Sequence, residues 1–210
     1  GTVQTVDNNG VLGGHIGHIP LWSFLRTTPL TRAGDNIKAL VSSLDHDPSN
    51  PLATLHQLSD VVRGAVEFVP GATDVTTTAE HALSAGNGVC QDHAHIFLSA
   101  ARLLDIPARY VGGYLKMDGC VEQDAGHGWA EAHVKGLGWV GFDVANGICP
   151  DERYVRVATG CDYREAAPFT GIATGTGGSR LAVHVSVDDY EMEPQLQAQQ
   201  QSCAGGQSQA

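Results

Sequence analysis

Apolar residues recur every three or four positions in the first half of the chain, which is the period of an α-helix. The pattern runs from 31 to 44 and again from 51 to 68. In the second segment one broad apolar stripe comprises Leu52, Leu55, Leu58, Val62, Ala65 and Val66. Stripes of this kind predict two amphipathic helices that each bury one face against a core.

Two further helices are predicted on either side of a glycine loop. Thr77 and Glu80 have the spacing of a capping box, which predicts the start of a short helix that ends near Ala85. The loop Gly86-Asn87-Gly88 then stops that helix. A longer helix is expected from Cys90 to Leu104, because its apolar positions keep helical spacing and an Ile-Pro pair follows.

After this helix the hydrophobic period changes to that of β-strands. Short β-prone runs, separated by Gly, Asp, Asn or Pro, cover 108–115, 129–135, 138–144, 154–159 and 181–187. The sequence Lys135-Gly136-Leu137-Gly138 is typical of a hairpin loop and would pair the second and third of these runs antiparallel. Helices followed by strands indicate an α+β fold, with N-terminal helices packed on an antiparallel β-sheet.

The two ends of the chain differ in character from its middle. Residues 1–30 mix valines with turn-forming Asn, Gly and Pro, and we interpret them as an extended lead-in. Their abrupt, strand-like start favours a fragment whose upstream neighbour is missing. Residues 31–188 carry the helical and β patterns and form the expected domain. Residues 189–210 are rich in Gln and have no apolar period, so we expect a disordered tail.

The balance of charges excludes several classes of partner. The 210 residues contain 12 Lys and Arg against 23 Asp and Glu, a net charge of −11, which disfavours nucleic acid and acidic membrane surfaces. No apolar stretch approaches the roughly 20 residues that span a bilayer. Five cysteines without CxxC spacing do not predict a disulfide framework. Free thiols and the missing export signal favour a cytoplasmic protein.

Cys90 is the first candidate for chemistry, because a glycine loop delivers it to the first turn of the predicted long helix. The helix dipole and unpaired backbone N–H groups would favour the thiolate there, and the same N–H groups could stabilise an oxyanion. A free cysteine is more often a small buried hydrophobe, so this segment alone gives the two interpretations about even weight. The charge of Asp92 would oppose the thiolate, so we expect its carboxylate to point away into a structural hydrogen bond.

His127 and Asp143 are the second and third candidates, since they lie on the two strands of the predicted hairpin. With a turn at 135–138, position 130 lies roughly across from 143, so a modest offset brings the two side chains together. If the N-terminus of the long helix packs against that edge, the carboxylate orients the imidazole and the imidazolium holds Cys90 as thiolate. Taken singly, His127 could be a turn residue and Asp143 a strand-end Asx turn.

Three stretches carry a resemblance to a known family: GNGVCQDHAHIFLSAARLLDIPARYVGGYL, GHGWAEAHVKGLGWVGFDVANG and DERYVRVATGCDYREAAP, which span 86–168. They resemble the transglutaminase-like superfamily, and specifically its bacterial members described as cysteine proteases. The resemblance implies a papain-like α+β core in which Cys90 is the nucleophile, His127 the general base and acid, and Asp143 the residue that orients the histidine. The family's usual upstream β-rich domain agrees with a missing neighbour.

The resemblance also implies a reaction, namely attack on a carboxamide or peptide carbonyl of a peptide or protein substrate through a thioester. Water would then give a protease or deamidase, whereas a primary amine would give a crosslink, and the sequence does not choose between them. Gly128 departs from the family, which usually has Ala there, but it leaves the catalytic side chains in place. The chain has no D-x-[DN]-x-[DN]-G loop, so no calcium, other metal or cofactor is expected.

Other residues of these segments invite alternatives. The candidates for lining an active-site cleft are His93, Tyr114, Trp129 and Asn146. Cys90, His93 and His95 superficially resemble a metal cluster, but on a helix position 95 is turned away from the other two. The rival from another class is a catalytically inactive domain that binds a peptide or a partner protein.

Overall fold

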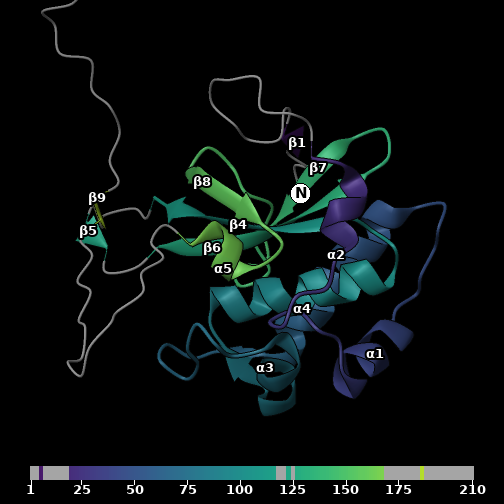
Figure 1. Ribbon diagram of the computed structural model, residues 1–210, viewed down its shortest axis with the longest axis horizontal. Coiled ribbons are helices and arrows are strands. Elements are labelled where there is room, and N and C mark those ends of the chain that lie inside the picture. The colour runs from purple at the N-terminus through teal and green to yellow at the C-terminus, as the bar shows by residue number, and fades with distance from the viewer. Residues whose placement is uncertain (1–4, 7–18, 117–121, 124–125, 168–184, 187–210) are drawn as a thin grey trace, which may run out of the picture.

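The computed structural model describes residues 5–6, 19–116, 122–123, 126–167 and 185–186, and at its centre lies a β-sheet (Figure 1). Within these residues the sheet has five strands, in the spatial order β1 (Thr5–Val6), β7 (Gly138–Phe142), β6 (His127–Val134), β4 (Ala108–Leu115) and β8 (Tyr154–Gly160). Every neighbouring pair is antiparallel. Four of the five predicted β-prone runs, those at 108–115, 129–135, 138–144 and 154–159, therefore meet in one sheet.

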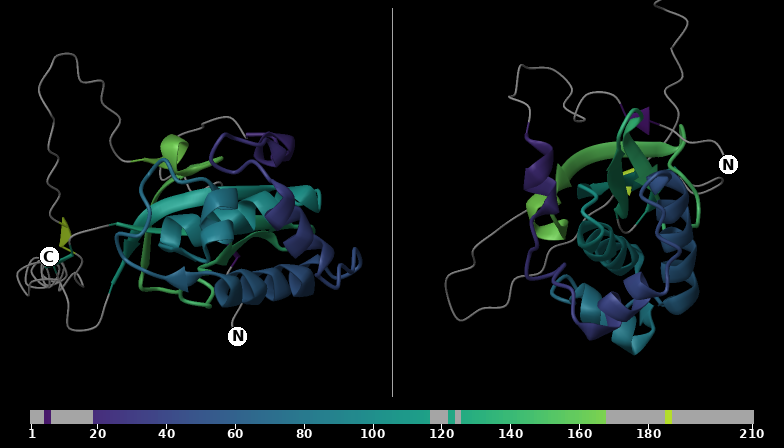
Figure 2. Two further views of the ribbon diagram at one scale, coloured as in Figure 1. Left: turned by 90° about the horizontal axis from the view of Figure 1, so that it is seen from below. Right: turned by 90° about the vertical axis from the view of Figure 1, so that its right-hand side faces the viewer.

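Helices from the first half of the chain cover one face of this sheet. The central helix, α4 (Cys90–Leu103), contacts β6 and β4, while α1 (Asp35–Ser42), α2 (Pro51–Ala65) and α3 (Ala79–Ala85) pack around it. Figure 2 shows α4 between the sheet and the outer helices. Because α4 is enclosed on all sides, every residue from Gln91 to Arg102 is buried. The predicted α+β fold, with helices packed on an antiparallel sheet, is confirmed.

Several short elements complete the described fold. They are the 3₁₀ helix η2 (Leu21–Leu25), the parallel pair β2 (Glu67–Phe68) and β3 (Asn87–Gly88), the antiparallel pair β5 (Glu122–Gln123) and β9 (Val185–Ser186), and α5 (Tyr163–Ala166). Within the described part of residues 1–30, Leu21–Leu25 form η2 and depart from the extended lead-in expected there. The tail at 189–210 lies outside the described residues. None of the described helices is long and apolar enough to cross a bilayer.

Glu80 caps a different helix from the one that the sequence spacing predicted. The N-cap of α3 is Thr78, whose hydroxyl accepts a hydrogen bond from the N–H of His81. The Glu80 carboxylate instead accepts from backbone N–H groups at the start of α1, those of Gly34, Asn36 and Ile37. The capping box at Thr77 is therefore wrong. A contact between two helices supplies the cap, and local spacing cannot reveal it.

The predicted hairpin forms, but with its register changed by one residue. Ala130 pairs with Phe142 rather than lying across from Asp143. Gly136 and Gly138 have φ angles of 89° and 85°, a region that glycine enters without strain. Asp143 consequently lies just beyond the last paired residue of β7. It reaches the same end of the sheet as His127, the first residue of β6.

The face of the sheet that points away from α4 carries a buried ion pair. Arg109 and Glu131 are register partners on β4 and β6, and their Nε and Oε2 atoms are 2.7 Å apart. The Arg109 guanidinium lies over the ring of Trp139 at 3.9 Å, and that ring packs edge-on against Phe24 of η2. Successive strand residues alternate between faces, so this cluster lies opposite the helical core. Arg109 and Trp139 are therefore structural.

Candidate active site

Cys90 is the first residue of α4, and the loop before it is fixed by backbone pairing. Gly86 ends α3 in the left-handed region at φ 70°, and β3 then pairs with β2. At the helix start the Asp92 carboxylate accepts hydrogen bonds from the Val89 N–H and the Thr73 hydroxyl. The prediction that Asp92 takes a structural hydrogen-bonding role is confirmed. Its bonds tie the first turn of α4 to a neighbouring loop.

His127 and Asp143 meet at the end of the hairpin, as the sequence predicted. The Nε2 atom of His127 lies 2.6 Å from Oδ2 of Asp143, which is the distance of a strong charge-assisted hydrogen bond. The imidazole is 15% exposed and the carboxylate is fully buried. One edge of the histidine is therefore held by a buried anion, while the ring keeps some access to solvent.

Cys90 also lies close enough to His127 to influence the charge of its ring, so that one imidazole interacts with both partners. Burial opposes its charge, but the hydrogen bond to Asp143 and the interaction with Cys90, together with the negative charges of both groups, outweigh burial and raise the pKa of His127 to about 10. An imidazolium beside the sulfur favours a thiolate. The three residues come from α4, β6 and the loop after β7, so only the folded chain brings them together.

Two further residues besides His127 donate hydrogen bonds to the Asp143 carboxylate. The Tyr154 hydroxyl donates to Oδ2 at 2.6 Å, and Asn146 donates its side-chain amide to Oδ2 at 2.7 Å and its backbone N–H to Oδ1 at 3.2 Å. Burial disfavours the charged form, yet these bonds and the His127 charge lower the pKa of Asp143. The carboxylate therefore stays ionised although it is fully buried.

Tyr154 is a site residue that the sequence reasoning missed. It opens β8, eleven residues beyond Asp143, and its ring packs edge-on against Trp129 at 5.3 Å. Burial and the bond to Asp143 raise the pKa of its hydroxyl, which therefore remains a donor. The available signal for a role of Tyr154 in the site was its position inside the stretch DERYVRVATG. Nothing in that pattern, however, shows which side chain β8 turns toward β6.

The four residues predicted to line a cleft differ in their burial and in their contacts. His93 is 1% exposed, and its two ring nitrogens lie 2.9 Å and 3.0 Å from the carbonyl oxygens of Val89 and Val66, so its interpretation as a cleft-lining residue is wrong. Trp129 is also buried, where it stacks beside His127. Asn146 binds Asp143 directly.

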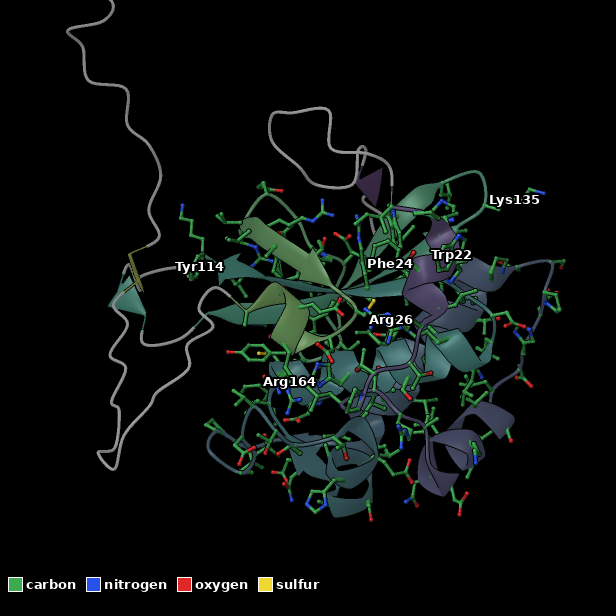
Figure 3. The ribbon with its side chains drawn as sticks, viewed as in Figure 1. Trp22, Phe24, Arg26, Tyr114, Lys135 and Arg164 are labelled. Carbon is green, nitrogen blue, oxygen red and sulfur yellow. The ribbon has the colours of Figure 1, made fainter. Side chains whose placement is uncertain are left out.

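Tyr114 is the remaining cleft candidate. It is half-buried on β4, and its ring is 3.7 Å from the position that a Cβ on Gly126 would take, beside the entry to β6. Figure 3 shows it at the end of the sheet that lies well away from Trp22 and Phe24. Its place next to the segment that leads into His127 is compatible with the predicted role, which stays a prediction.

The alternative of a metal site at Cys90, His93 and His95 is not supported by the surroundings of the two histidines. Both ring nitrogens of His93 face carbonyl oxygens, and Nε2 of His95 accepts the backbone N–H of Tyr163 at 3.1 Å. Burial lowers the pKa of His95 to about 4, which keeps its ring neutral. Among the described residues, no three or more His, Cys, Asp or Glu side chains are grouped so as to hold a metal ion.

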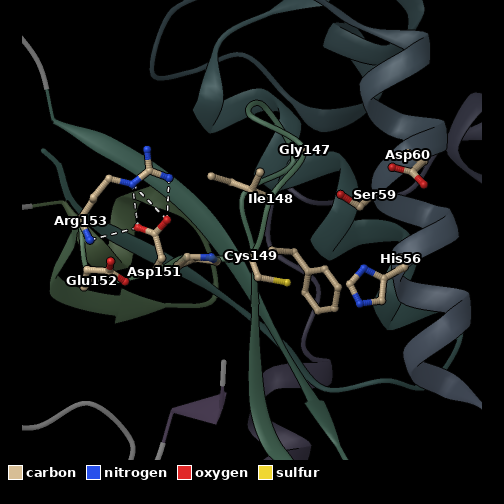
Figure 4. A pocket seen from close by; sticks show the side chains of 11 residues that line it. His56, Ser59, Asp60, Gly147, Ile148, Cys149, Asp151, Glu152 and Arg153 are labelled. Carbon is tan, nitrogen blue, oxygen red and sulfur yellow. Dashed lines mark hydrogen bonds and ion pairs between the residues drawn. The ribbon is translucent and has the colours of Figure 1, made fainter. Parts of the chain in front are cut away.

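A separate cavity of about 600 Å³ lies between α2 and the loop that joins β7 to β8 (Figure 4). His56, Asp60 and Cys149 are among its lining residues, whereas Cys90 and His127 are not. Burial raises the pKa of the Cys149 thiol, so this cysteine stays protonated near neutral pH. The cavity is therefore distinct from the Cys90–His127–Asp143 group, and Cys149 offers a matched control for Cys90.

Relatives and a solved structure place this arrangement in a wider group. An uncharacterized protein of Mycobacterium leprae is 32% identical over 170 residues, which cover 78% of this chain and 59% of that protein. An uncharacterized protein of Mycobacterium tuberculosis (strain H37Rv) is 32% identical over 157 residues, covering 70% of this chain and 50% of that protein. The chain thus spans between half and three fifths of the length of these relatives.

The solved structure is described as "a Putative Cysteine Protease from Cytophaga hutchinsonii", and it superposes with a TM-score of 0.65 at 25% identity, over 82% of this chain and 57% of that one. Fold and site together define a papain-like α+β domain with a cysteine at a helix start and a His–Asp pair beside it. The sequence profile of the transglutaminase-like superfamily matches residues 38–144, more than half of the chain. The chain belongs to the transglutaminase-like superfamily.

Proposed function

We propose that this protein catalyses cysteine-dependent acyl transfer or hydrolysis at carboxamide or peptide bonds, through a thioester. The observation that supports this proposal is the position of His127, which is hydrogen-bonded to Asp143 and interacts with Cys90. A histidine in this position can act both as counter-ion of a thiolate and as the acid that protonates a leaving nitrogen. Asp143 keeps the ring oriented and stabilises its positive charge.

In the first half of the proposed reaction, the Cys90 sulfur attacks the carbonyl carbon and the C=O electron pair moves onto oxygen. When that pair returns, the C–N bond breaks and His127 gives its proton to the departing nitrogen, so that ammonia or an amine leaves a thioester. In the second half, water or a primary amine attacks the thioester and gives its proton to His127. Cys90 then leaves as thiolate, which restores the starting state.

We propose a peptide or protein as the acyl donor, and water or a primary amine as the acceptor. The family and the net charge of −11 support this class over a polyanionic substrate. The runner-up is a catalytically inactive domain that binds a peptide or a partner. It would use the same fold without turnover.

Product analysis tests the proposal. The protein is incubated with a Gln-containing peptide, with and without a primary alkylamine, and the products are weighed by mass spectrometry. Conversion of the amide to an acid indicates hydrolysis, an amine adduct indicates transfer, and peptide fragments indicate proteolysis. If none of these products forms and Cys90 shows ordinary thiol reactivity, the inactive binding domain is the better account.

Cys90 should be the most reactive of the three described free cysteines toward iodoacetamide. At pH 6.5 we expect alkylation at least about tenfold faster than at Cys149, because alkylation needs the thiolate and only Cys90 has an imidazolium beside it. Peptide mapping after timed quenching gives both rates from one sample. Equal rates at Cys90 and Cys149 would count against an activated thiol and remove the main support for the enzyme.

A further inference from the structure

Tyr110 is a buried residue of β4 whose ring is held between α4 and α5. Its centroid is 5.3 Å from that of His95 on α4 and 6.1 Å from that of Tyr163 on α5, the latter in an edge-on arrangement. The residue is only 3% exposed. Packing on both sides fixes the direction of the ring, so the place of its hydroxyl is fixed too.

Two glycines make the space into which this hydroxyl extends. Gly112 and Gly128 are register partners on β4 and β6, and the Tyr110 ring lies along this pair. A Cβ on Gly128 would stand 2.0 Å from the Tyr110 hydroxyl oxygen and 2.7 Å from its Cζ, distances that atoms cannot occupy. A side chain at position 128, next to His127, would therefore exclude the Tyr110 hydroxyl from this space. Gly128 admits a phenol hydroxyl to the active site.

The hydroxyl of Tyr110 is free to donate a hydrogen bond. Among the described residues it has no hydrogen-bond partner, and it is not one of the fully enclosed polar atoms that lack one, so it borders accessible space. Burial, and then the charge of Cys90, raise the pKa of Tyr110 well above its ordinary value. The group therefore keeps its proton close to the reacting sulfur.

A second free donor belongs to Cys90 itself. The N–H of Cys90 belongs to the first turn of α4 and has no acceptor among the described residues, whereas the N–H groups of Asp92 and His93 bond to the Val89 carbonyl. A developing oxyanion at the carbon that the sulfur attacks is stabilised by hydrogen-bond donors close to that sulfur. One backbone N–H alone would leave half of the new charge unsupported.

We propose that the Tyr110 hydroxyl is an oxyanion donor of this enzyme, acting together with the N–H of Cys90. When the sulfur attacks, the new S–C bond forms and the carbonyl electron pair moves onto oxygen, which accepts hydrogen bonds from both groups. No proton leaves Tyr110, because the pair returns to re-form C=O as the C–N bond breaks. The inference rests on the proposed function and adds a catalytic residue to it.

The test compares Tyr110→Phe with the wild-type chain in two reactions. Iodoacetamide alkylation displaces iodide from carbon and develops no oxyanion, so its rate at Cys90 should stay within about twofold. Turnover of the Gln-containing peptide does develop an oxyanion. For this reaction the kcat of Tyr110→Phe should fall about 100-fold, with little change in KM. Tyr163→Phe, which removes a neighbouring phenol hydroxyl, is the matched control and should change neither reaction. Gly128→Ala should lower kcat as well, because its Cβ takes the place of the hydroxyl.

Each outcome decides the inference. A loss of kcat with normal alkylation supports it. Unchanged kcat in Tyr110→Phe overturns it and leaves the proposed function standing. Equal losses in both reactions assign the hydroxyl to the thiolate or to folding, and also overturn the inference. A wild-type chain that is alkylated at Cys90 but turns over nothing removes the proposed function itself.

Discussion

Replacing Cys90 with alanine abolishes product formation from the Gln-containing peptide, by on the order of 10⁶-fold if the site behaves like other nucleophile–histidine systems. The reason is that no other described thiol can take its place: Cys149 lines a separate cavity, and burial raises the pKa of Cys161. The fold should survive, because the Cys90 side chain is only partly buried and alanine suits the first turn of a helix. Mass spectrometry of the products, with circular dichroism of the variant, measures both effects.

Cys149→Ala is the control for this experiment. It removes a thiol of similar exposure that lies on the loop after Asp143 and lines the separate cavity. We expect its turnover to remain within about twofold of wild type, as for a substitution away from the reacting atoms. Full activity in Cys90→Ala, or equal losses in both variants, contradicts the assignment of the nucleophile.

Replacing Asp143 with asparagine lowers kcat by on the order of 10⁴-fold, because a neutral amide no longer supports the His127 imidazolium or fixes its orientation. The substitution keeps the size of the side chain, so the loss is electrostatic. The pKa of His127 should fall from about 10, since the bond to Asp143 contributes to raising it. A pH titration of the imidazole by NMR measures that fall, and steady-state kinetics measure kcat.

The same variant should lose stability in a pH-dependent way. The raised pKa of His127 stabilises the folded state fully below its ordinary value of 6.5, and this contribution disappears as pH rises toward about 10. The lowered pKa of Asp143 stabilises the folded state above its ordinary value of 3.8, and this is lost in stronger acid. The difference in melting temperature between wild type and Asp143→Asn should therefore be largest between about pH 4 and 6.5.

Asp47→Asn is the control for the charge change. Asp47 is exposed and hydrogen-bonded to Ser49, so its pKa is also lowered, but it lies on the loop between α1 and α2. The Asp47→Asn substitution should leave kcat and the pH titration of His127 unchanged. An unaltered His127 titration in Asp143→Asn would mean that the two side chains are not paired in solution.

The helices and strands could largely be predicted from local patterns. The long helix from Cys90 and the strand at 108–115 match α4 and β4 closely, because their periods and their flanking Gly and Pro residues are local signals. The wrong predictions concern features that depend on contacts with a segment distant in the sequence. The true partner of Glu80 is the start of α1, and the hairpin register depends on side-chain packing as well as on its turn.

The residues of the candidate site were likewise predicted only in part. Cys90, His127 and Asp143 stood out because each occupies an element boundary with suitable chemistry. Tyr154 was missed, and His93 was placed in a cleft although its ring is sealed against two carbonyl oxygens. The direction of a side chain on a strand or a buried helix depends on neighbours that are remote in sequence. Local sequence patterns do not identify those neighbours.

By itself the sequence determined the α+β order of elements, a cysteine at a helix start, and a histidine and an aspartate on one hairpin, because periodicity and turn chemistry act over a few residues. Only the tertiary structure decided that these three side chains meet, that Tyr154 and Asn146 hold the carboxylate, and that Gly128 makes room for the hydroxyl of Tyr110. The physical reason is that hydrogen bonds and pKa shifts depend on distances of a few ångströms, and packing between distant segments sets those distances.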